Sequence, residues 1–185
     1  GYQDLSPWGS SYATHFLLEA RKAGYEVPQG GLDRAVKALR ASVERVPAAN
    51  ERSAFFYDNL AYACYVLAVG GEPINSWQER MLEKKSELSY YSRLMNASAL
   101  LVQGEPKRAV ALLEELGLPG PGSRDLGGAF NSLNRNAALL LSAWLDIDPK
   151  HDNVFKLVQA LRKTRINGYW GTTQESAMAL MALGK

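Results

Sequence analysis

Apolar segments recur along the chain at a nearly regular spacing. Each is long enough for a helix and has almost no polar side, and each is followed by a turn. The segments begin at Tyr12, Tyr57, Leu94, Asn134 and Gln174. The spacing of about 40 residues matches one helical hairpin per repeat. The chain is therefore predicted to be a series of hairpins, each containing one buried helix.

The segments between these apolar runs are predicted to be amphipathic helices. Their apolar residues recur every three or four positions, and charged residues occupy the other side. The stripes are Leu32, Ala35, Val36, Leu39 and Val43; Ala109, Leu112, Leu113 and Leu116; Val154, Leu157, Val158 and Leu161; and, less regularly, Trp77, Met81 and Leu88. Gly-, Asp- and Pro-containing breaks at 70–73, 104–106 and 146–149 separate the helices, with each proline close to the next helix start.

An alternation of apolar and half-polar helices predicts an all-α fold, because no segment alternates with period two for long enough to form a strand. The simplest way to bury both kinds is an inner ring of apolar helices inside an outer ring of amphipathic ones, an α/α toroid. An open solenoid is the competing arrangement. Residues 1–185 are predicted to form a single toroid domain or a fragment of one. The irregular stretch from Gly117 to Gly128 is interpreted as a surface connection.

The last predicted helix has clear start and stop signals. Thr172 and Glu175 have the spacing of a capping box, in which the threonine hydroxyl accepts from the glutamate N–H and the carboxylate reaches back to the cap. The run from Ala177 to Leu183 has no polar face, and Gly184 provides a stop. We expect this helix to be buried on nearly all sides.

Composition excludes few functions. The net charge is +2, from 21 basic and 19 acidic residues scattered along the chain, so no basic stripe predicts nucleic-acid binding. The single cysteine, Cys64, lies in an apolar run and is expected to be a buried core residue. A single cysteine cannot form an intramolecular disulfide, and it does not show whether the protein resides in an oxidising or a reducing compartment. We find no signal peptide, lipobox or transmembrane segment, and the abrupt ends lead us to expect a fragment of a longer protein.

We predict no catalytic, cofactor-binding or metal-ligating residue and no cofactor. His15 and His151 lack ligand neighbours and are expected to be structural. The carboxylates do not pair in sequence: Asp58 and Asp125 are isolated, Glu114 and Glu115 lie on an outer helix, and Asp146 and Asp148 follow an inner one. Trp8, Trp77, Trp144 and Trp170 are expected to pack rather than to line a cavity. Two alternatives stay open: a toroidal enzyme acting on polysaccharide or isoprenoid, whose acids converge only in three dimensions, and a helical-repeat adaptor that binds peptides.

Three segments resemble the thioester-containing domain of bacterial alpha-2-macroglobulins. They are SPWGSSYATHFLLEARKAGYEVP (Ser6 to Pro28), SLNRNAALLLSAWLDIDP (Ser132 to Pro149) and LVQALRKTRINGYWGTTQESAMALMALGK (Leu157 to Lys185). The ending, with its tryptophan, Thr-Gln-Glu and Ala-Leu-Gly, is the most specific. The resemblance implies an α/α toroid. It also implies a role in a periplasmic, lipid-anchored protease inhibitor of bacterial defence, with attacking proteases and macroglobulin-like β-sandwich domains as partners.

The family's thioester motif, Cys-x-Glu-Gln, is absent from this sequence. Cys64 is followed by Tyr65, Val66 and Leu67, so no part of the motif transfers to it. In the family the motif lies near the N-terminal end of the domain, and we expect it upstream of Gly1 if the parent has one. Trp170, Thr172, Thr173, Gln174 and Glu175 are interpreted as helix-start structure. We expect no catalysis from this part of the chain.

Overall fold

The computed structural model describes residues 7–46, 53–120 and 131–185. These residues form α-helices, one short 3₁₀ helix and an isolated antiparallel bridge between Ile166 and Tyr169, with no strand. The all-α prediction is confirmed. The chain divides into two compact units, Gly1–Gly104 and Glu105–Lys185. Each is described by itself, and the predicted single domain stays a prediction.

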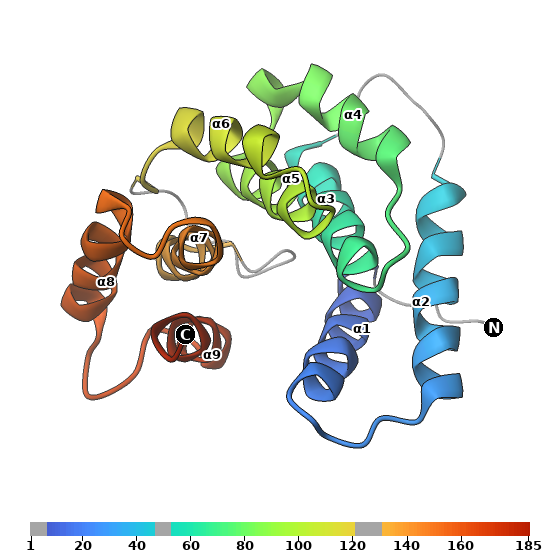
Figure 1. The fold of residues 1–185 in the computed structure, drawn as a ribbon, viewed down its shortest axis with the longest axis horizontal. Helices are drawn as coiled ribbons and strands as arrows, with labels where there is room; N and C mark the ends of the chain where they lie inside the picture. Colours follow the sequence, from blue (N-terminus) through green and yellow to red (C-terminus); the bar gives the residue numbers. More distant parts are fainter. Residues whose placement is uncertain (1–6, 47–52, 121–130) are drawn as a thin grey trace. The chain divides into compact units, whose positions relative to one another are not determined.

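The first unit is built around α3 (Figure 1). This helix packs against α5 and α1, while α2 and α4 lie against the inner helices. The elements are α1 (Pro7–Lys22), α2 (Gln29–Glu44), α3 (Ala54–Val69), α4 (Asn75–Glu83), the 3₁₀ helix η1 (Lys85–Glu87) and α5 (Tyr90–Val102).

The second unit is built around α7, which packs against α8 and α9 and also contacts α6 (Figure 1). Its helices are α6 (Pro106–Leu116), α7 (Leu133–Ile147), α8 (Asp152–Thr164) and α9 (Thr173–Leu183). In the described part of the chain, no helix combines the length and the apolar character that crossing a membrane requires.

Three of the inner helices, α3, α5 and α7, are buried as the apolar runs predict. Each presents core residues on several sides, so that Tyr62, Leu67, Met95 and Leu141 are almost inaccessible to solvent. The amphipathic prediction is confirmed in the same way. Outer helices bury one stripe each: Leu32, Val36, Leu39 and Val43 on α2; Trp77 and Met81 on α4; Ala109 and Leu113 on α6; Leu157 and Leu161 on α8.

The expectation of a final helix buried on nearly all sides is wrong within this structure. On α9 only Glu175, Ala179 and Ala182 are buried, whereas Leu180 is 63% exposed and Met181 53%. The apolar character of α1 is exposed as well, most of all at Phe16. The physical reason is the number of helices that pack against each helix. The helices α3 and α7 are each packed against at least two others, while α9 packs mainly on α7 and leaves its opposite face uncovered among the described residues.

Four of the inner helices share one kind of beginning. A hydroxyl side chain at the N-cap accepts a hydrogen bond from the backbone N–H three residues later in α3, α5, α7 and α9. The four caps are Ser53, Ser89, Ser132 and Thr172. Because each cap satisfies a backbone donor that would otherwise lack a partner, it fixes where its apolar helix starts. No hydroxyl caps α2, α4, α6 or α8.

The inner helices of the first unit also share one kind of ending. Two residues beyond α1, α3 and α5 lies a glycine with positive φ: Gly24, Gly71 and Gly104. After α1 and α3 the next N–H bonds back to the helix, from Tyr25 to the Ala20 carbonyl and from Glu72 to the Leu67 carbonyl. This is the Schellman stop, for which glycine is the favoured residue.

Candidate functional site

Asp58 is the one carboxylate buried in the first unit among the described residues. It lies in the second turn of α3 and accepts hydrogen bonds from two hydroxyls of α5, those of Ser89 and Ser92. The Ser92 bond measures 2.6 Å. Ser89 also caps α5. The cluster therefore joins the beginning of one inner helix to the beginning of the next.

His15 occupies a second polar cluster in the first unit, between α1 and α3. Its Nδ1 lies 3.0 Å from the Tyr62 hydroxyl, and its Nε2 is 3.9 Å from the Glu19 carboxylate. The ring makes edge contacts with Tyr62 and Tyr65. These contacts agree with the structural role predicted for His15.

His151 has a structural setting in the second unit. Its Nδ1 accepts from the Asn153 N–H at the start of α8, so this imidazole is the N-cap of the helix. The ring stacks on Trp144 with centroids 3.8 Å apart and planes within 4°. In the ranges that the structure describes, no three His, Cys, Asp or Glu residues come together as a metal site.

The second unit also buries a single carboxylate among its described residues, that of Glu175. Thr172 caps α9 by accepting from the Glu175 N–H at 3.1 Å, which is one half of the predicted capping box. The Glu175 carboxylate accepts from Asn134 on α7 at 2.9 Å. Glycosidic chemistry needs a pair of carboxylates. Neither unit, in its described part, buries such a pair.

The other acids named in the sequence lie on the surface or outside the description. Glu114, Glu115 and Asp148 are exposed, and Asp146 pairs with Lys185. Asp125 falls outside the described residues, as does most of the predicted connection from Gly117 to Gly128.

The tryptophans pack against neighbouring groups. Trp170 is buried and donates from its indole nitrogen to the Leu161 carbonyl at 2.9 Å, while its backbone N–H donates to the Ser176 hydroxyl. Trp8 stacks on Tyr12, and Trp77 lies beneath the Arg80 guanidinium. Trp170, Thr172 and Glu175 therefore serve the start of α9, which is the role that the sequence predicts for them.

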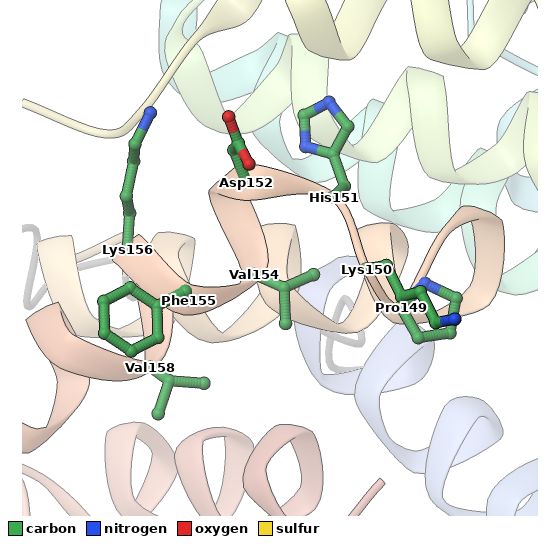
Figure 2. A pocket seen from close by; sticks show the side chains of 8 residues that line it. All are labelled: Pro149, Lys150, His151, Asp152, Val154, Phe155, Lys156 and Val158. Carbon is green, nitrogen blue, oxygen red and sulfur yellow. The ribbon is translucent and has the colours of Figure 1, made fainter.

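One surface hollow of about 490 Å³ lies at the start of α8 and contains no tryptophan. Its lining runs from Pro149 to Val158 (Figure 2). In the figure, His151, Asp152 and Lys156 extend on one side of the helix, and Val154 and Val158 extend on the other. In this view the two sets of side chains point away from each other.

Comparison with known proteins identifies relatives along the whole chain. An alpha-2-macroglobulin from Xylella fastidiosa (strain Temecula1 / ATCC 700964) is 29% identical over 197 aligned residues, which cover all of this chain and 12% of the relative. The alpha-2-macroglobulin of Escherichia coli K12 is 26% identical over 97% of the chain and 11% of its own length. This chain is similar along its length to bacterial alpha-2-macroglobulins. No family model matches it.

Solved structures of bacterial alpha-2-macroglobulins have the same fold. Native Escherichia coli alpha-2-macroglobulin, from domain MG7 to the C-terminus, matches 98% of the chain with a TM-score of 0.78 at 24% identity, over 30% of that structure. Salmonella alpha-2-macroglobulin reacted with methylamine matches 99% with a TM-score of 0.80 at 24% identity, over 12% of that structure. The likeness confirms the predicted fold class, an all-α arrangement of the α/α toroid type. The matches along the whole chain confirm the predicted resemblance to bacterial alpha-2-macroglobulins. The chain spans about an eighth of the curated relatives that it matches.

Cys64 is a core residue of α3. Its side chain is buried, and burial raises the pKa of the thiol from 9.0 to about 12. Desolvation has this effect because it disfavours the thiolate. The apolar role predicted for Cys64 agrees with this setting.

We expect Cys64 to resist thiol reagents in the folded chain. At pH 8 a thiol with a pKa of about 12 is almost entirely protonated, and the thiolate is the reacting form. Ellman's reagent should label the native chain at least a hundredfold more slowly than the same chain in urea, an order-of-magnitude expectation from the thiolate fraction and burial. Because the folded-state pKa is raised, raising the pH from 7 to 9 should leave native labelling slow. Equal labelling rates with and without urea would contradict this placement of Cys64.

Proposed function

We propose that the chain is the helical scaffold of an alpha-2-macroglobulin-like protease trap and that it has no catalytic role of its own. The observation that carries the proposal is the likeness over nearly the full chain to a part of each solved alpha-2-macroglobulin structure. Two further Escherichia coli structures are described as activated by porcine elastase and by trypsin, and the Salmonella protein as reacted with methylamine. Those descriptions connect the relatives with proteases and with an amine-reactive group.

In this proposal the parent polypeptide is a periplasmic lipoprotein of bacterial defence. Macroglobulin-like β-sandwich domains flank the helical scaffold, and proteases are captured after they cleave a bait segment elsewhere in the parent. A thioester, where the parent has one, lies upstream of Gly1. The buried carboxylates Asp58 and Glu175 support a structural role for this part, because each is held by polar groups of an adjacent inner helix.

The proposed task of the scaffold is to shield the acylating group against neighbouring domains until the bait is cut. Uncovered apolar side chains on α1 and α9 support this idea. Phe16, Leu180 and Met181 are each more than half exposed. Apolar surface of this kind gains free energy when another surface covers it.

The test begins with the gene sequence upstream of Gly1, read for Cys-x-Glu-Gln, a lipobox and β-sandwich domains. The parent protein is then incubated with elastase, with and without prior methylamine treatment, and hydrogen exchange is followed in α1 and α9. We expect a covalent complex with elastase that methylamine prevents, and faster exchange in both helices after cleavage. Changed exchange without a covalent complex would indicate a non-covalent trap. No complex and no change in exchange would overturn the proposal.

A further inference from the structure

The outward side of α8 combines apolar and cationic side chains. Residues seven positions apart lie on the same side of a helix. Phe155 therefore lies on the same side of α8 as Arg162. Lys156 lies on the same side as Lys163. The opposite side buries Leu157 and Leu161 against the core of the second unit. Phe155 is 69% exposed.

The turn that follows α8 extends this surface. Asn167 and Gly168 both have positive φ, at 51° and 93°, and hydrogen bonds run in both directions between Ile166 and Tyr169. This is the geometry of a type I′ turn, for which Asn-Gly is a preferred sequence. The adjoining Trp170 is buried, which anchors the turn. Both Ile166 and Tyr169 are held with more than half of their surface in solvent.

We call these side chains the α8 basic face, which consists of Phe155, Lys156, Arg162, Lys163, Arg165, Ile166 and Tyr169. Its net charge is positive, because four cations stand against the one carboxylate of Asp152, which extends on the same side of α8 as Lys156. Within 149–172 the only carboxylate is that of Asp152. Among the described residues no carboxylate pairs with Lys156, Arg162 or Lys163, in contrast to Arg40 and Lys185, which have carboxylate partners.

We propose that the α8 basic face binds the anionic lipid headgroups of a membrane surface. Charge complementarity is the first argument, because each lysine or arginine near an anionic membrane contributes to binding. The arrangement of the exposed apolar side chains is the second argument. Phe155 on the helix and the Ile166–Tyr169 pair on the turn lie beside cations, as in surfaces that insert aromatic and aliphatic side chains at the headgroup level. A protein interface is instead depleted in lysine and gathers its apolar residues into a core.

Vesicle sedimentation of the 185-residue chain tests this inference without reference to protease inhibition. The probes are phosphatidylcholine vesicles with and without phosphatidylglycerol. We expect binding only to the phosphatidylglycerol vesicles, and less binding at high salt. The double variant Arg162→Gln/Lys163→Gln should weaken binding on the order of tenfold. Tyr169→Ser should weaken it further by removing an inserted ring.

The matched control is Arg34→Gln/Lys37→Gln, which removes two exposed cations from α2 and so changes the net charge equally. Circular dichroism verifies that each variant is folded. Absence of binding to phosphatidylglycerol vesicles would overturn the proposal, and so would an equal loss of binding in the control. Retention on polyglutamate beads without vesicle binding would assign the face to an acidic protein partner and would also overturn it.

Discussion

Replacing Trp144 by alanine should destabilise the second unit by about 3–5 kcal/mol, the range for removing a fully buried aromatic side chain. Trp144 is 1% exposed and lies in the last turn of α7. It also supports the imidazole that caps α8, since the two rings are stacked. The loss should therefore reach α8 as well as α7. Hydrogen exchange followed by mass spectrometry measures this, because it separates the amides of the second unit from those of the first.

Two other variants define what the indole contributes. Trp144→Phe keeps a ring that can stack on His151. It also loses no hydrogen bond, because the indole nitrogen of Trp144 has no hydrogen-bond partner among the described residues. This substitution should lower the free energy of unfolding by less than about 1.5 kcal/mol. Phe155→Ala, on the exposed side of α8, should change the free energy of unfolding by no more than about 0.5 kcal/mol. A cost for Trp144→Ala no larger than that for Phe155→Ala would refute the packing described for α7.

Replacing Asp58 by alanine should destabilise the first unit by about 2–4 kcal/mol, because hydrogen bonds to a charged group contribute about 1.5–3 kcal/mol each and a buried hydroxyl is left without its acceptor. The two hydroxyls that lose this acceptor belong to Ser89 and Ser92. Exchange should rise at the beginnings of both α3 and α5, since the cluster joins them. The readout is exchange protection in those two helices, compared with that in α2.

Asp58→Asn retains an oxygen that can accept from the serines, so we expect about half the cost of the alanine variant or less. The matched control is Asp33→Ala on α2, where an exposed aspartate bonds to Gln29. The Asp33→Ala change should alter the free energy of unfolding by no more than about 0.5 kcal/mol. If exchange rises in α3 alone after Asp58→Ala, the proposed link between the two helix starts is wrong.

Local features of this chain could be predicted from the sequence, because they depend on residues a few positions apart. The cap at Thr172, the stripe on α2 and the breaks before α4, α6 and α8 are of this kind. The partners of Asp58 could not be predicted. They lie 31 and 34 residues away, on a helix whose register against α3 only packing determines. The same holds for His15 and Tyr62, which are 47 residues apart.

Burial of α1 and α9 was beyond sequence reasoning for a different reason. Apolar composition indicates how much surface a helix can bury, but not how many neighbours are present to bury it. The run from Ala177 to Leu183 is as apolar as the core of α3, yet Leu180 and Met181 remain exposed. The α8 basic face also escaped prediction, since its cations are diluted in a net charge of only +2 for the chain.

The hydroxyl at the start of α3, α5, α7 and α9 has a consequence for how such chains can diverge. Since Ser53, Ser89, Ser132 and Thr172 each set the first turn of their own helix, the preceding connection can gain or lose residues without rotating the apolar side chains that follow. Insertions and deletions among relatives should therefore collect immediately before these four positions. A gap within an inner helix would turn its core residues toward water, and lineages that carried one would be lost.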